Sequence, residues 1–180
     1  MTLLDSNWLA EGYSSKSHEK KAKAGGRNYL AAFYNNFEKE PFKTIKVEEP
    51  FILRLTPDLK IAGRIDRIDK LEKGIELIDY KTGYKTPTQK EVDNNFQLTV
   101  YALAATNQGV LNKKPEELTL SLYFLENGTK IKTKRTKEQL KQAEKEIIKI
   151  AEEISESDFS PKVSNRCDFC EYRMLCDAWK

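Results

Sequence analysis

Hydrophobic and polar residues follow two different periods along the chain, and the change of period marks the predicted elements. In three segments apolar side chains recur every three or four residues, which is the period of an amphipathic helix. Shorter runs rich in β-branched and aromatic residues end at turn-forming sequences such as Asn127-Gly128 and are typical of strands. We therefore predict helices over residues 16–39, 88–108 and 137–155, and strands over residues 44–55, 60–71, 75–81, 118–125 and 130–134.

The order of these elements predicts a mixed α/β fold. One helix precedes three strands joined by short turns, and a second helix, a hairpin and a third helix follow. Short turns favour antiparallel pairing of the first three strands. Gly25 and Gly26 lie inside the first predicted helix, where each glycine costs about 1 kcal/mol relative to alanine. We therefore expect this helix to be weakened or divided at the two glycines.

Composition limits the class of protein. The chain has 180 residues, of which 39% are hydrophobic, enough for one globular domain with a core. No run approaches the roughly 18 apolar residues of a membrane span, and the N-terminus lacks a signal-peptide pattern, so we expect a cytoplasmic protein without a membrane partner. The formal net charge of +3 is too small to indicate a polyanionic ligand by itself.

The three cysteines of the chain all lie close to its C-terminus. They are Cys167, Cys170 and Cys176. An odd and clustered set favours metal ligation over the disulfide framework of a secreted protein, in which cysteines pair in even numbers. This segment is the first specific indication of a bound cofactor in the sequence.

Two acidic residues on neighbouring predicted strands form the most informative constellation. If the turn centres on residues 72–73, facing residues have numbers that sum to 145, which places Asp66 opposite Asp79 and Arg64 opposite Lys81. Side chains two residues apart on a strand share a face. We therefore expect these four side chains to converge on one face of the sheet.

Two facing carboxylates repel each other unless positive charge lies between them. Oxygen ligands of this kind suit Mg²⁺ or Mn²⁺, which keep several waters and also hold a phosphate oxygen. The nearby Lys81 could position a water or stabilise charge on a phosphorane-like transition state. The constellation therefore indicates a hydrolase that acts on phosphodiester bonds.

Salt bridges offer an alternative interpretation of the same residues. The two aspartates would pair with Arg64, Arg67 and Lys81 on a solvated hairpin. The spacing of the residues alone supports this interpretation and a metal site equally. A one-residue slip through a bulge at Gly74 would also separate the two carboxylates.

Three motifs resemble those of RecB-like nucleases in the PD-(D/E)XK superfamily. They are Gly-x-x-Asp at residues 63–66, Asp-x-Lys at residues 79–81 and Gln-x-x-x-Tyr at residues 97–101, and they occur in the family's order. The resemblance runs from about residue 44 to the C-terminus, and Ile-Asp-Tyr-Lys-Thr-Gly at residues 78–83 is its most specific part. It implies a restriction-endonuclease-like fold, in which helices flank a mixed central sheet, and a metal-dependent DNA nuclease.

The resemblance also implies roles for individual residues. Asp66 and Asp79 would be metal ligands, with the backbone carbonyl of Tyr80 as a further ligand, and Lys81 would be the catalytic lysine. Glu48 matches an acidic position often found on the preceding strand.

Further residues are expected around this centre. Glu49 is the register alternative to Glu48. Gln97 and Tyr101 lie one helical turn apart, so both could look toward the site and contact DNA. The other candidates for DNA contacts, which lie near the expected metal, are Arg64, Arg67 and Lys85.

The cysteine segment of this family usually supplies three ligands of an iron–sulfur cluster, with the fourth cysteine far upstream. Cys167, Cys170 and Cys176 match the C-terminal three, and no fourth cysteine is present, so iron–sulfur or zinc binding would need the intact protein. His18 lacks the glycine that accompanies the family's histidine, and we expect it to be a surface residue. These absences suggest the C-terminal part of a larger nuclease of the UvrD or AddAB helicase type.

The sequence therefore predicts one nuclease domain with a helical part at residues 1–40, a core at 41–160 and a cysteine tail at 161–180. We expect an Mg²⁺- or Mn²⁺-dependent deoxyribonuclease, an exonuclease module of a DNA repair helicase that lies in cis or in trans. A catalytically incomplete DNA-binding or scaffolding module with the same fold is the alternative. A redox or zinc module ranks last, because it leaves the two aspartates unexplained.

Overall fold

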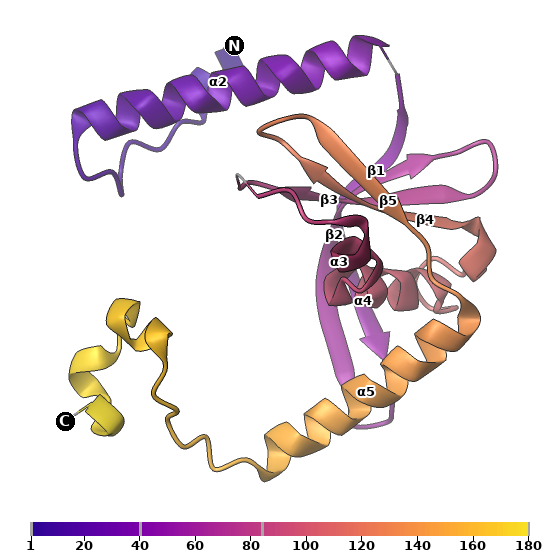
Figure 1. Ribbon diagram of the computed structural model, residues 1–180. Helices are drawn as coiled ribbons and strands as arrows, with labels where there is room; N and C mark the ends of the chain where they lie inside the picture. The colour runs from indigo at the N-terminus through magenta and orange to yellow at the C-terminus, as the bar shows by residue number, and fades with distance from the viewer. Residues whose placement is uncertain (1, 40, 84, 180) are drawn as a thin grey trace. The chain divides into compact units, whose positions relative to one another are not determined.

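A five-stranded sheet forms the centre of the fold in the computed structural model, which describes residues 2–39, 41–83 and 85–179 (Figure 1). The strand order is β1-β2-β3-β4-β5. All neighbours are antiparallel except β3 and β4, which are parallel, so the predicted mixed sheet is confirmed. The strands are β1 (Lys43–Arg54), β2 (Lys60–Lys70), β3 (Ile75–Lys81), β4 (Leu118–Phe124) and β5 (Thr129–Thr133).

Helices connect and cover these strands in the predicted order. A parallel pair such as β3 and β4 needs a crossover connection, and two helices supply it here. The α-helices of the described residues are α1 (Thr2–Ser6), α2 (Lys16–Lys39), α3 (Gln89–Asp93), α4 (Phe96–Thr106) and α5 (Lys137–Glu156).

The crossover contains two helices where the sequence pattern predicts one. Asn94 ends α3, and Asn95 begins α4 as its N-cap, with a side-chain oxygen that accepts a hydrogen bond from the Leu98 N–H at 2.9 Å. Asparagine side chains compete with helical backbone bonds and therefore favour caps over helix interiors. The apolar period continues through the break, which is why periodicity alone did not reveal it.

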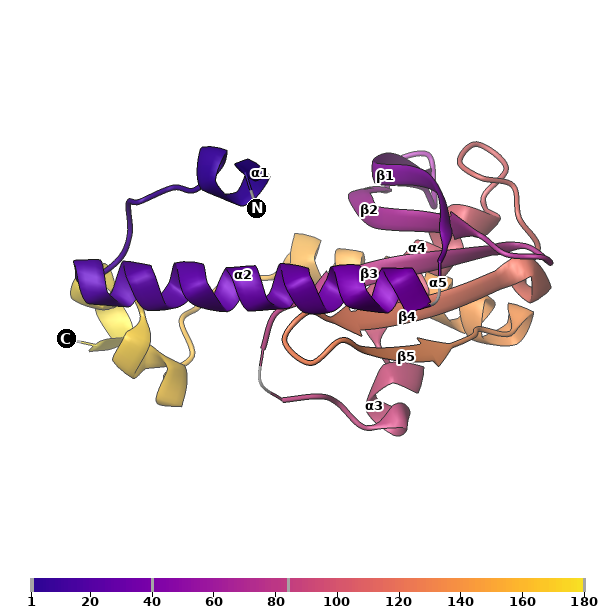
Figure 2. The same ribbon diagram turned by 90° about the horizontal axis from the view of Figure 1, so that it is seen from above.

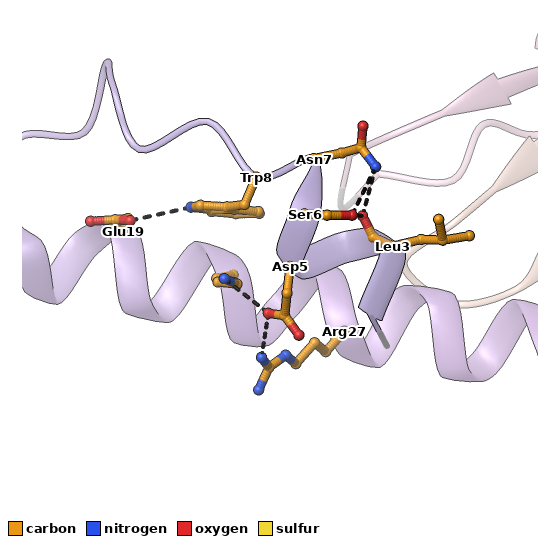
Figure 3. Close-up of polar contacts among 8 residues, drawn as sticks. Leu3, Asp5, Ser6, Asn7, Trp8, Glu19 and Arg27 are labelled. Atoms are coloured by element: carbon orange, nitrogen blue, oxygen red, sulfur yellow. Dashed lines mark hydrogen bonds and ion pairs between the residues drawn. The ribbon is translucent and has the colours of Figure 1, made fainter.

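The two glycines of α2 do not divide it, so the expected break at this point is wrong. A Cβ at Gly26 would lie 3.9 Å from the Trp8 ring, which places this part of α2 against the segment that follows α1. Asp5 of α1 forms an ion pair with Arg27 at 2.7 Å, and Trp8 donates a hydrogen bond to Glu19 at 3.3 Å (Figure 3). Contacts between segments thus offset the low helix propensity of glycine.

Different helices cover the two faces of the sheet (Figure 1). The α4 helix packs against β1, β3 and β4, and its Leu98 is fully buried. The C-terminal half of α2 lies over the opposite face, as Figure 2 shows from above, and its Phe33 ring lies 6.0 Å from the Tyr80 ring. Side chains alternate along β3, so neighbouring residues of that strand face different helices.

The chain divides into two compact units, Met1–Glu144 and Lys145–Lys180. The boundary falls within α5, so the sheet belongs to the first unit and the cysteines belong to the second. Among the described residues, none of the helices combines the length and the apolar character that a membrane span requires.

The glycines predict a graded response to alanine substitution. Gly25→Ala should raise the free energy of unfolding by about 0.5–1 kcal/mol, because α2 has open space there. Gly12→Ala should lower it by about 1–2 kcal/mol, since Gly12 has a φ of +88° and no neighbouring atom. Gly74→Ala should lower it by more than about 2 kcal/mol, because the new Cβ would meet the Glu117 carbonyl. Urea unfolding measures the free energy of unfolding of all three variants. An equal loss for Gly12→Ala and Gly74→Ala would contradict the close packing of the β2–β3 turn against Glu117.

Candidate active site

The register between β2 and β3 is the one that the sequence predicts. Arg67 pairs with Ile78 and Ile68 pairs with Leu77, so facing numbers sum to 145. No irregularity interrupts this pairing near Gly74, and the slip that would have separated the carboxylates does not occur. The pairing ends at Arg67 and Ile78, one position before the two aspartates.

The sheet forks at this position. Strand β2 stays paired with β1, where Arg64 lies opposite Pro50, and β3 stays paired with β4, where Asp79 lies beside Leu122. The Asp66 side chain bridges the fork, because its Oδ2 atom accepts a hydrogen bond from the Tyr80 N–H at 2.8 Å. A side-chain carboxylate thus takes the place of a backbone partner.

Four side chains form a connected polar network on the α4 side of the fork. The Lys81 ammonium lies 2.6 Å from Asp79 Oδ2 and donates a hydrogen bond to Gln97 Oε1 at 2.8 Å. The Gln97 amide donates to the Tyr101 hydroxyl at 3.1 Å, and that hydroxyl donates to Asp79 Oδ1 at 3.3 Å. Strand β3 and helix α4 therefore hold one another's polar side chains.

Asp79 is buried, with 2% of its surface exposed. Burial raises the pKa of Asp79 above its ordinary value, the Lys81 ammonium opposes this change, and the Asp66 charge adds to it. Burial also raises the pKa of Tyr101, and the negative charge of Asp79 contributes. The negative charges of Asp79 and the nearby Asp66 therefore act on one another, and within the network it is the Lys81 ammonium that opposes them.

This environment fits a divalent cation held by few protein ligands. Asp79 Oδ2 is buried and faces the Lys81 ammonium at 2.6 Å, and the Asp66 carboxylate is close enough to act on Asp79 electrostatically. Two carboxylates leave most coordination positions of Mg²⁺ to water and phosphate oxygens, an arrangement that is common for this ion. Within the described part of the chain, no group of three or more His, Cys, Asp or Glu side chains is arranged to hold a metal.

Of the two acidic alternatives on β1, Glu48 is the one that contacts a residue predicted for the site. It forms an ion pair with Arg64 at 3.6 Å, whereas Glu49 pairs with Lys46. Glu48 has a φ of +50°, a left-handed conformation that costs a non-glycine residue of order 1–3 kcal/mol and often occurs at functional sites.

The glycine of the Gly-x-x-Asp motif has a packing role. An added Cβ at Gly63 would lie 2.5 Å from Phe51, so the ring occupies the space that a side chain would need. The same ring packs edge to face against Tyr101, with centroids 6.1 Å apart. Gly63 and Phe51 thus support the tyrosine that binds Asp79, a role that the motif alone did not reveal.

The residues that were expected to contact DNA differ in their exposure to solvent. Gln97 is exposed at the site, while Tyr101 is 5% exposed and bound to Asp79. Arg64 and Lys85 are exposed. Arg67 is 4% exposed and lies on the α2 side of the sheet, where its guanidinium stacks 3.8 Å from the Phe42 ring centroid. Arg67 is therefore not among the DNA contacts that we propose.

Arg135 supports the site through a set of contacts that the sequence did not reveal. It is buried and donates hydrogen bonds to Thr99 and to the backbone carbonyls of Val92 and Asn95, at 2.8–3.2 Å. These bonds tie the break between α3 and α4 to the segment after β5. They hold the first turn of α4, which carries Gln97.

The three cysteines line one small hollow of about 30 Å³ in the second compact unit, together with Trp179. All three are free thiols. They do not form a metal-binding group in the described structure, and a four-thiolate iron–sulfur cluster does not fit a set of three.

Comparison with known proteins agrees with the fold. The family described as the PD-(D/E)XK nuclease superfamily matches residues 1–177 of the chain. The crystal structure of SSO0001 superposes with a TM-score of 0.52 and 18% sequence identity, covering 89% of this chain and 72% of that one. At this identity the structural match supports the fold alone.

Asp79→Asn should stabilise the folded protein at pH 7 in the presence of a chelator, because it removes a buried charge. Burial raises the Asp79 pKa, so the ionised form is unfavourable above the folded-state pKa, and this cost fades as pH falls toward the ordinary value of 3.8. The gain in the free energy of unfolding should therefore shrink between pH 7 and pH 4 in urea titrations.

Asp69→Asn is the matched control. Asp69 is also buried, but its ion pair with Arg67 at 3.0 Å is buried too, so losing the charge should destabilise by about 3–5 kcal/mol. Destabilisation of similar size in both variants would show that Asp79 is a structural ion-pair partner as well.

Proposed function

The chain belongs to the PD-(D/E)XK nuclease superfamily, and we propose that it is a deoxyribonuclease that depends on Mg²⁺ or Mn²⁺. The observation that carries this proposal is the fork between β2 and β3. Asp66, bound to the Tyr80 amide, and the buried Asp79 lie within electrostatic reach of each other, with the Lys81 ammonium beside them.

In this proposal Asp66, Asp79 and the Tyr80 carbonyl hold the ion. When bound, such an ion polarises a phosphodiester and makes water a better nucleophile. Lys81 contacts Asp79 and Gln97, and its side chain is one-third exposed, so its ammonium can donate a further hydrogen bond to a phosphate oxygen as charge develops there. Tyr101 orients Asp79 through its hydroxyl.

Exposed polar residues on β2, on α4 and in the segment after β3 supply the DNA contacts that we propose. Arg64 and Lys85 would bind backbone phosphates, and Gln97 would reach DNA from the first turn of α4. Glu48 forms an ion pair with Arg64 at 3.6 Å and, in this proposal, is a further acidic residue beside the DNA contacts. Phosphate contacts of this kind carry little sequence preference, which suits a processing nuclease.

The narrower assignment rests on the sequence motifs. We propose a RecB-like exonuclease module of a DNA repair helicase, in cis or in trans, because the three motifs and the cysteine segment have that family's order and spacing. Binding of iron–sulfur or zinc at Cys167, Cys170 and Cys176 requires a ligand beyond these three thiols.

A DNA-binding module without catalysis is the second candidate function. It is favoured by one observation, that the described residues contain no third carboxylate or histidine arranged with Asp66 and Asp79. In such a protein the fork would bind backbone phosphates without hydrolysing them.

Cleavage of labelled single- and double-stranded DNA separates the two functions. The protein should degrade DNA with Mg²⁺ or Mn²⁺ and not with EDTA, and Asp79→Ala and Lys81→Ala should each lower the rate at least about 100-fold. Lys73→Ala, an exposed lysine in the turn at the other end of the β2–β3 hairpin, is the matched control and should leave the rate unchanged. Metal-dependent cleavage that survives in both site variants would refute the residue assignment, and DNA binding without cleavage would favour the second candidate.

A further inference from the structure

Arg67 is joined to the catalytic strand from the face opposite the site. Its Nη1 atom donates a hydrogen bond to the Tyr80 hydroxyl at 2.6 Å, and its guanidinium carbon lies 5.4 Å from the centre of the Tyr80 ring. Asp69 neutralises the guanidinium at 3.0 Å and accepts a hydrogen bond from Thr44. Arg67 therefore has a fixed position, because its guanidinium contacts Tyr80 of β3 and Asp69 of its own strand β2, and Asp69 is in turn bound by Thr44 of β1.

Aromatic rings from outside the sheet pack around Arg67 and Tyr80 and form with them what we call the aromatic enclosure. Phe42 stacks on the guanidinium of Arg67, and Phe33 of α2 packs edge to face against both Tyr80 and Tyr123. The Tyr80 and Tyr123 rings are themselves 5.8 Å apart. The Tyr80 side chain is thus held by a hydrogen bond from Arg67 and by ring packing against Phe33 and Tyr123.

Tyr80 connects this enclosure with the catalytic centre through its own backbone. Its amide N–H is the group that holds Asp66, and its neighbours in the chain are Asp79 and Lys81. Ladder pairing with β2 has ended at this point, so β3 lacks a strand partner on the side of the fork. The orientation of the Tyr80 peptide then depends on β4 and on the anchored side chain.

We propose that Arg67 is a positioning residue for the nuclease site, acting through the Tyr80 hydroxyl. Arg67 fixes the tyrosine side chain on the α2 face and thereby sets the orientation of the Tyr80 peptide, whose N–H holds Asp66. The same peptide sets the spacing of Asp79 and Lys81 on the other face. The effect on catalysis rests on the proposed function, whereas the effect on the Tyr80 peptide does not.

Tyr80→Phe tests this most directly, because it removes the hydroxyl that Arg67 binds and keeps the ring. Hydrogen exchange of the residue 80 amide should accelerate about tenfold, since its bond to Asp66 is held less well. In the cleavage assay kcat should fall about tenfold with KM unchanged, because the DNA contacts stay in place.

Tyr123→Phe is the matched control. It removes a hydroxyl from the same aromatic cluster, one that accepts a hydrogen bond from Asn36 of α2 at 3.2 Å, but it lies on β4. Residue 80 exchange and kcat should both stay at the wild-type level. Arg67→Lys, which keeps a positive charge near Asp69 and loses the two-pronged geometry, should reproduce Tyr80→Phe.

Two results would overturn the inference. One is residue 80 exchange in Tyr80→Phe that matches wild type, and the other is an equal change in Tyr80→Phe and Tyr123→Phe, which would indicate general loosening of the cluster. Wild-type protein that does not cleave DNA would refute the proposed function, and the amide exchange would still decide whether Arg67 positions the Tyr80 peptide.

Discussion

The hydrogen bond from the Tyr80 N–H to Asp66 is the interaction on which the site depends. It forms where the β2–β3 ladder stops, so one carboxylate closes the fork and is fixed by it. The second carboxylate, Asp79, is buried on the neighbouring residue and carries the cost of that burial. Both are held next to each other by the fold, and a bound cation would relieve the repulsion that results.

Residues on both faces of the sheet hold the site in place. On one face α4 supplies Gln97 and Tyr101, which fix the polar ends of Lys81 and Asp79. On the other face an aromatic enclosure around Arg67 holds the strand that carries them. Alternation of side chains along β3 links the faces, since each successive residue of the strand is bound from the opposite side.

Much of this could be predicted from the sequence. The register of the paired β2 and β3 residues followed from the position of one turn, and the convergence of Asp79 with Lys81 followed from their two-residue spacing on one strand. What could not be predicted depends on contacts between distant segments. The burial of Arg67 beneath Phe42, the support of α4 by Arg135 and the continuity of α2 through its glycines all arise from packing, which leaves no periodic pattern.

Titration of the apo protein with Mn²⁺, followed by electron paramagnetic resonance, tests the central claim most directly. If the fork encloses a cation site, wild-type protein should bind one ion with an affinity that falls at least about tenfold in Asp66→Asn and in Asp79→Asn. Unchanged Mn²⁺ affinity in both variants would contradict the account, because the two carboxylates would then have no part in binding the metal.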